Sequence, residues 1–235
     1  METSIPRIFH QIWLQGKMPD EHCYLRDHIL ELHPNWEYKF WSYENMPKLK
    51  NEEIFNKLNM LMFKSDILRY EILESMGGIY IDTDFILYKN IEPIIPQNQF
   101  LVYEFNKLVI SNAIMGFSKN HFIMNYINNI IPYEYRQNFE RIKQNENEHR
   151  AGLSCIGPLL LTKVIKELLT DIKPYDEKFF YPFHSYDMKT KQLEKYTDSY
   201  GAHLWNFNNG TKSLEIHKTL PCYIRKQEKT ISELN

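Results

Sequence analysis

Two aspartates separated by one residue, Asp82 and Asp84, have the spacing in this 235-residue sequence that points most directly to chemistry. They follow the apolar run 79–81, which has the composition of a buried strand. Two carboxylates at the end of a buried strand can both reach a hard divalent cation. Such a cation can bridge the two phosphates of a nucleotide and stabilise them as a leaving group. An isolated Asp-x-Asp also occurs in solvated turns, so its surroundings decide its meaning.

The segment before this pair has the apolar periodicity of a helix, which we expect over residues 57–76. Asp66 and Arg69 stand three positions apart on it, so their side chains share one helix face. Without the downstream aspartates they would be interpreted as an ordinary surface ion pair. Gly77 and Gly78 end the helix and permit a tight turn into the strand.

The elements that must position these residues alternate between short strands and longer helices, which predicts one α/β domain with a largely parallel sheet. Strands are expected over 8–13, 36–41, 79–81, 100–104 and 113–117, and further helices over 21–33, 121–131 and 158–169. The polar segment 134–150 is expected to be an exposed helix or a mobile lid.

Composition excludes several classes of function. The 28 basic and 30 acidic residues nearly balance, so no nucleic-acid partner is indicated. The three cysteines are widely spaced and form no zinc or disulfide pattern. The sequence has no signal peptide and no 18-residue apolar run, which leads us to expect a cytoplasmic protein without a transmembrane segment. Peripheral contact with a membrane stays open.

The string 64–84 closely resembles the DXD sugar-binding region of glycosyltransferases related to the fungal initiating α-1,6-mannosyltransferases. This region is shared with α-1,4-galactosyl- and N-acetylglucosaminyltransferases and with bacterial cytotoxin glucosyltransferases. Looser similarity extends in order over 5–13, 34–41, 112–117, 157–158 and 203–205. The resemblance implies a GT-A fold, which is a Rossmann-like, mostly parallel sheet flanked by helices, with the nucleotide-sugar at the carboxyl ends of the strands. Residues 1–225 would then form a single GT-A catalytic domain, followed by a frayed tail over 226–235.

The resemblance also implies an enzymatic activity, namely transfer of a hexose or N-acetylhexosamine from a UDP- or GDP-sugar to a glycan, glycolipid or glycoprotein acceptor. It implies retention of the anomeric configuration and dependence on Mn²⁺ or Mg²⁺. Asp84 would be the firmer metal ligand, while Asp82 would face the metal shell and the ribose or donor sugar. Asp66 and Arg69 would bind the donor sugar and its phosphate.

Three more donor-site residues follow from the resemblance: Trp13 near the nucleotide base, Asn112 and Trp205. His203 would complete the metal shell, since a neutral imidazole is a reasonable manganese ligand. The open alternatives are a core aromatic for Trp13 and a hydrogen-bonded loop histidine for His203.

The sequence identifies no general base for this reaction. On the acceptor side the candidates are Asn112, Glu104 and the neighbourhood of His184 and Asp187.

Two other functions remain open. Phosphatases of the haloacid dehalogenase type also place Asp-x-Asp after a buried strand, and Asp82 would be their nucleophile. Ile86 occupies the position where their pattern calls for Thr or Val, and the motif normally follows the first strand. The second alternative is a non-catalytic module that binds a nucleotide-sugar or a glycan.

Overall fold

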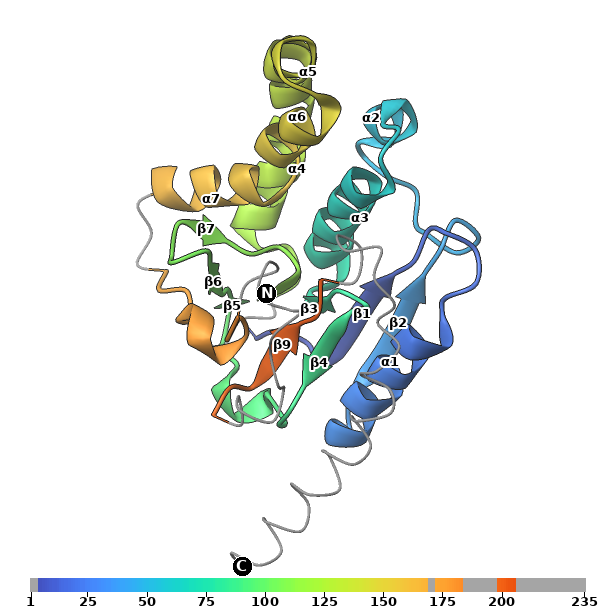
Figure 1. Cartoon of the computed structure of the whole chain (residues 1–235), viewed down its shortest axis with the longest axis vertical. Helices are drawn as coiled ribbons and strands as arrows, with labels where there is room; N and C mark the ends of the chain where they lie inside the picture. The colour runs from blue at the N-terminus through green and yellow to red at the C-terminus, as the bar shows by residue number, and fades with distance from the viewer. Residues whose placement is uncertain (1–3, 169–171, 184–197, 206–235) are drawn as a thin grey trace, which may run out of the picture.

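A computed structural model describes residues 4–168, 172–183 and 198–205. Its main sheet has five strands in the order β2-β1-β3-β8-β5 (Figure 1). Their bounds are β1 Ile8–Ile12, β2 Glu37–Trp41, β3 Gly78–Ile81, β5 Gln99–Phe100 and β8 Ile114–Phe117. Strand β1 pairs in parallel with β2 and β3, whereas β8 is antiparallel to both β3 and β5. Four strands therefore share one direction, and the expected α/β class with a mostly parallel sheet is confirmed.

Two small antiparallel sheets accompany the main one. Strand β4, Phe85–Leu87, pairs with β9, Gly201–His203, and β6, Tyr103–Glu104, pairs with β7, Val109–Ile110. The expectation of one strand over 100–104 is wrong, because this stretch is divided between β5 and β6. At the break, the carbonyl oxygen of Leu101 accepts from the amide of Tyr175, and the amide of Tyr103, the first residue of β6, donates to the carbonyl oxygen of Tyr175.

The helices lie beside and beyond the main sheet, with α1 alongside β2 and β4 in Figure 1. They are α1 Asp20–Leu32, α2 Glu52–Lys57, α3 Leu61–Met76, α4 Phe122–Glu134, α5 Glu140–Asn145, α6 Glu148–Cys155 and α7 Pro158–Glu167. Short 3₁₀ turns cover Glu92–Ile94 and Glu177–Phe179. No helix of the described residues is long and apolar enough to cross a bilayer.

The single expected helix over 57–76 is also wrong at its start. Residues Leu58 and Met60 have extended backbones, so α2 ends at Lys57 and α3 begins at Leu61. The segment 134–150 is helical, with a π-helix over Tyr135–Phe139 between α4 and α5. Both Glu134 and Phe139 are buried, so this segment is anchored to the core at its first turns.

Strand β3 is buried on both faces, which explains its continuous apolar sequence. Tyr80 packs in a core with residues of α3, α4 and α7. Ile79 and Ile81 point to the other face and pack with Ile29 of α1. The strand that carries the two aspartates is therefore held between two layers of side chains.

Glycine is required where α3 turns into β3. Gly77 has φ +68° and Gly78 has φ +100°, a region that side chains with a Cβ rarely adopt. A Cβ on Gly78 would lie 2.7 Å from the carbonyl oxygen of Ile8 on β1. The pair thus ends the helix and also lets β3 approach β1 closely.

Candidate active site

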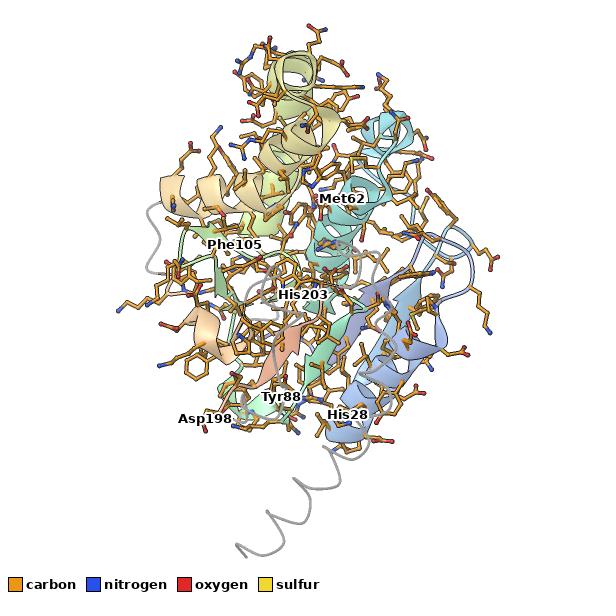
Figure 2. The ribbon with its side chains drawn as sticks, in the orientation of Figure 1. His28, Met62, Tyr88, Phe105, Asp198 and His203 are labelled. Atoms are coloured by element: carbon orange, nitrogen blue, oxygen red, sulfur yellow. The ribbon has the colours of Figure 1, made fainter. Side chains whose placement is uncertain are left out.

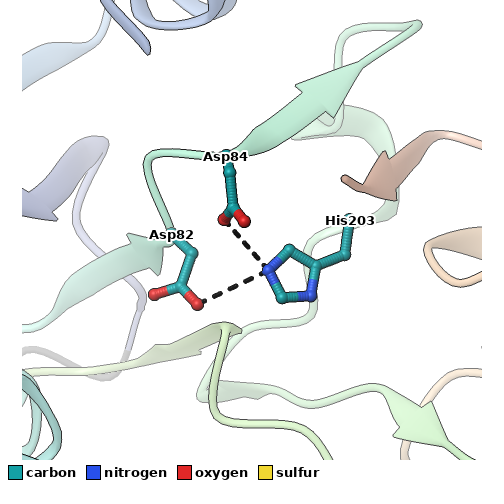
Figure 3. Close-up of side chains that lie close together, drawn as sticks. All are labelled: Asp82, Asp84 and His203. Atoms are coloured by element: carbon teal, nitrogen blue, oxygen red, sulfur yellow. Dashed lines mark hydrogen bonds and ion pairs between the residues drawn. The ribbon is translucent and has the colours of Figure 1, made fainter. Parts of the chain in front are cut away.

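The carboxylates of Asp82 and Asp84 meet the imidazole of His203 at the carboxyl end of β3 (Figure 3). Nε2 of His203 lies 3.0 Å from Oδ1 of Asp84 and 3.7 Å from Oδ2 of Asp82. One ligand atom from each residue falls within 4.8 Å of the others. Two carboxylate oxygens and one imidazole nitrogen at this spacing form a donor set that suits a divalent cation.

The fold brings His203 to the aspartates through the pairing of β4 with β9. Phe85 lies opposite His203 in that ladder, and their rings stack at 5.4 Å with 13° between the planes. The amide of Leu204 also donates to the carbonyl oxygen of Asp84 at 2.9 Å. Figure 2 shows the resulting position of His203 near the middle of the molecule.

The electrostatic environment of His203 is dominated by its acidic neighbours. Burial disfavours the charged imidazolium, but the ion pair and hydrogen bond with Asp84, followed by Asp82 and Glu104, outweigh burial and raise the pKa of His203 to about 9. Its Nδ1 is buried and has no hydrogen-bond partner among the described residues. The acidic side chains around His203 therefore favour positive charge at this position.

Arg69 of α3 connects Asp66, on the same helix, with Asp82 after β3. Its guanidinium lies 3.2 Å from Asp66 and 3.4 Å from Asp82, and it donates to the carbonyl oxygen of Asn112 at 2.7 Å. It is buried and lies over the ring of Tyr80 at 4.2 Å. The planar donor group thus holds three separate segments in fixed relation.

Asp66 is buried next to this guanidinium. Burial raises the pKa of Asp66 to about 6, although Arg69 opposes the shift. The side-chain amide of Asn112 donates to Asp66 at 2.9 Å and to the hydroxyl oxygen of Tyr70 at 3.2 Å. Gly157 packs closely against this carboxylate, since a Cβ there would lie 3.1 Å from Oδ2 of Asp66.

The two predicted tryptophans flank this cluster. Trp13 follows β1, and its ring lies 5.0 Å from that of His22, whose Nδ1 bonds to Oγ1 of Thr83 at 2.8 Å. Trp205 lies 4.2 Å from the His203 ring, and its buried Nε1–H has no acceptor among the described residues. An unpaired N–H beside a cation site is suited to an anionic oxygen.

All eight residues predicted for the metal and donor sites therefore lie in one region. Six of them form direct contacts with another member, namely Asp66, Arg69, Asp82, Asp84, Asn112 and His203. Trp205 packs on His203, and Trp13 reaches the motif through His22. His184, Asp187 and the tail 226–235 lie outside the described residues.

Sequence reasoning missed Tyr80 as a member of the site. Its hydroxyl donates to Oδ1 of Asp82 at 2.5 Å while its ring supports Arg69. The strand alternation contained the signal, because Tyr80 is the residue of β3 that faces the same side as Asp82.

Comparison with known proteins agrees with this geometry. Residues 19–101 match the family described as the glycosyltransferase sugar-binding region containing the DXD motif. An uncharacterized glycosyltransferase of Acanthamoeba polyphaga mimivirus is 27% identical over 91% of this chain and 87% of its own length. A mannosyl phosphorylinositol ceramide synthase of Saccharomyces cerevisiae, SUR1, is 30% identical over 50% of this chain. The chain spans only 32% of that enzyme, and 54% of inositol phosphoceramide mannosyltransferase 1 of Schizosaccharomyces pombe.

Solved structures with the same fold are also glycosyltransferases. The PaToxG glycosyltransferase superposes with a TM-score of 0.58 and 16% identity, covering 71% of this chain and 70% of its own. The UDP-bound glycosyltransferase domain of the YGT toxin superposes with a TM-score of 0.53 and 11% identity, covering 71% of this chain and 78% of its own. The two other functions considered for the sequence are not favoured by these matches. The chain therefore has a GT-A fold, and its residues 19–101 match the DXD sugar-binding region of glycosyltransferases.

Proposed function

We propose that this chain is a metal-dependent, retaining glycosyltransferase that moves a hexose or N-acetylhexosamine from a UDP- or GDP-sugar to a glycan, lipid or protein acceptor. Residues 1–225 would form the single catalytic domain. The observation that carries the proposal is the convergence of Asp82, Asp84 and His203 beside the buried pair of Asp66 and Arg69. The acceptor classes follow the relatives, which include mannosyltransferases named for inositol phosphoceramide and a human α-1,4-N-acetylglucosaminyltransferase.

The donor set fits Mn²⁺ or Mg²⁺ held by Asp84, Asp82 and His203. Oxygen ligands suit both ions, and the imidazole favours manganese. The bound ion would supply positive charge to the diphosphate that leaves the sugar. As a metal ligand His203 would have to be the neutral imidazole, so it would give up the proton that its hydrogen bond with Asp84 otherwise favours.

The other residues would bind and orient the donor. Arg69 offers a fixed, permanently charged guanidinium to the phosphate, and the Nε1–H of Trp205 supplies a neutral donor on the side of His203. Asp66 and Asn112 present a carboxylate and an amide, the groups that hydrogen-bond sugar hydroxyls. Trp13 would lie against the base, where an aromatic face can stack.

Donor binding gives the first test. We expect a UDP- or GDP-sugar to raise the melting temperature in the presence of Mn²⁺, whereas the same sugar without the metal has a much smaller effect. A calorimetric and thermal-shift panel of UDP-, GDP- and dTDP-sugars with and without Mn²⁺ measures this. Equal binding with and without metal by every donor would contradict the metal-dependent site.

Turnover gives the second test. Asp84→Asn keeps the shape of the side chain but removes its charge, so we expect metal-dependent donor hydrolysis to be abolished. Full activity of Asp84→Asn would remove the central part of the proposal. NMR of the glycoside product then reports the anomeric configuration, for which we expect retention.

A further inference from the structure

Glu104 is a buried carboxylate next to the proposed donor site, and the proposed contacts to the metal and the diphosphate do not use it. It ends β6 and is only 6% exposed. No lysine or arginine of the described residues forms a salt bridge with it. A buried carboxylate without a lysine or arginine partner costs folding free energy, and such groups are concentrated at catalytic and ligand-binding sites.

Ser111 lies near the carboxylate, and its hydroxyl favours the charged form and so lowers the pKa of Glu104, against the larger upward effect of burial. Strands β6 and β7 pair Glu104 with Val109, and Ser111 directly follows β7. The Ser111 hydroxyl oxygen also accepts from the amide of Ala113 at 3.1 Å and contacts the Tyr181 hydroxyl. One side of the carboxylate thus faces Ser111, and the two carboxylate oxygens keep further acceptor positions.

The hairpin that carries Glu104 borders the candidate site. Among charged neighbours His203 influences its carboxyl most strongly, followed by Asp82. The Tyr181 ring meets the His203 ring edge-on at 6.0 Å. Figure 2 shows Phe105, the next residue on the hairpin, to one side of His203, and its ring lies 6.0 Å from that of Trp205.

The charge of Glu104 restricts what it can bind. Burial raises the pKa of the Glu104 carboxyl to about 7, and its charged form repels the diphosphate of a nucleotide-sugar, so its complementary partner is a hydroxyl that donates a hydrogen bond. Asp66 and Asn112 already provide groups that can hydrogen-bond the hydroxyls of the donor sugar. Asp66 lies on α3 in an ion pair with Arg69, and Asn112 follows Ser111 and accepts from Arg69 through its backbone oxygen. Glu104 approaches from a different element, on the hairpin next to His203 and Trp205.

We propose that Glu104 accepts a hydrogen bond from the attacking hydroxyl of the acceptor and orients that oxygen toward the donor sugar. This inference rests on the proposed function and adds a residue for the second substrate. Glu104 forms no covalent bond in this role. Its contribution is to hold the acceptor in a reactive orientation, which an enzyme needs in order to favour transfer over hydrolysis.

The partition between transfer and hydrolysis tests the role. In Glu104→Gln, we expect the transfer-to-hydrolysis ratio to fall about 10-fold, because the amide oxygen still accepts a hydrogen bond from the acceptor hydroxyl but without the charge that strengthens it. The assay contains Mn²⁺ and the nucleotide-sugar that binds in the panel described under the proposed function. The acceptor is the one that the unmodified chain glycosylates fastest among methyl α-mannoside, lactose and inositol phosphoceramide in detergent.

A matched control separates this role from support of the hairpin. Glu177 accepts a hydrogen bond from the amide of Asn106 at 2.6 Å, so it holds the turn of the same hairpin from outside. We expect Glu177→Gln to leave the partition ratio unchanged. Both variants should keep the affinity for UDP with Mn²⁺ measured by calorimetry to within about twofold, because neither residue touches the nucleotide.

Three results would count against the inference. An unchanged partition ratio in Glu104→Gln, or an equal fall in Glu177→Gln, would leave only a structural role. A loss of affinity for UDP with Mn²⁺ of about tenfold would instead place Glu104 on the donor side. These results contradict the inference alone, whereas failure of the unmodified chain to turn over any donor contradicts the proposed function as well.

Discussion

His10 makes the stability of this fold sensitive to mild acid. Its Nε2–H donates to the carbonyl oxygen of Gly77 at 2.8 Å, and its Nδ1 accepts from the indole N–H of Trp41 at 3.2 Å. A second proton would have to sit on Nδ1, where the indole N–H already points. Burial, partly opposed by the Gly77 bond and reinforced by Lys39, lowers the pKa of His10 from 6.5 to about 4.

The direction of the effect follows from proton binding. Between pH 6.5 and pH 4 the unfolded chain binds a proton at His10 that the folded chain rejects, so stability falls as the pH falls through this window. The two pKa values correspond to a loss from His10 alone of about 2 kcal/mol at pH 5 and about 3 kcal/mol at pH 4. Above pH 7 the contribution of His10 is complete.

Urea unfolding at pH 7.5, 5 and 4 measures this loss when the unmodified chain is compared with His10→Gln. The variant is less stable at pH 7.5 but lacks the titrating group, so its unfolding free energy should fall less steeply between pH 7.5 and pH 5. Proton NMR should show no titration of the His10 ring near pH 6.5. Parallel pH profiles of the two proteins, or a His10 pKa near 6.5, would refute the reasoning.

Three further predictions concern other positions. Arg69→Lys replaces the planar group that reaches both Asp66 and Asp82 with a single ammonium, so donor turnover should fall about 100-fold in a steady-state assay; near-normal turnover would contradict this. Gly78→Ala places a Cβ at φ +100° in close contact with backbone, so it should lower the unfolding free energy by about 2 kcal/mol or more in urea titrations; a neutral effect would show that the turn relaxes. Burial raises the pKa of the Cys155 thiol to about 11, so Ellman's reagent should modify it only as the chain unfolds in denaturant, and rapid labelling of the native protein would exclude this.

The sequence was most informative where structure is local. The apolar face of α3, the glycines after it and the apolar run of β3 are consecutive in the chain, so their periodicity predicts the helix, the turn and the buried strand that carries Asp82. The break between α2 and α3 was missed because the apolar periodicity continues through it. The extended backbone there is stabilised by a distant partner, since Glu148 accepts from the backbone and side chain of Asn59.

Contacts between distant segments were beyond such reasoning. Strand β9 has three residues, and nothing in their pattern specifies pairing with β4. The position of His203 beside Asp84 was therefore expected from family resemblance alone. The division of 100–104 has the same origin, because Tyr175 supplies the hydrogen bonds that separate β5 from β6.

The pairing of β4 with β9 also bears on the order in which the molecule assembles. Asp84 and His203 are 119 residues apart, and closing a chain segment of that length costs about 4 kcal/mol of conformational entropy. A three-residue ladder returns little of this by itself, so the contact depends on neighbouring parts that have already folded. The cation site is thus complete only when both ends of this long segment have met. A ligand that contacts both ends would stabilise their association. The backbone amide of Ala202 should then exchange its hydrogen more slowly when the ligand binds.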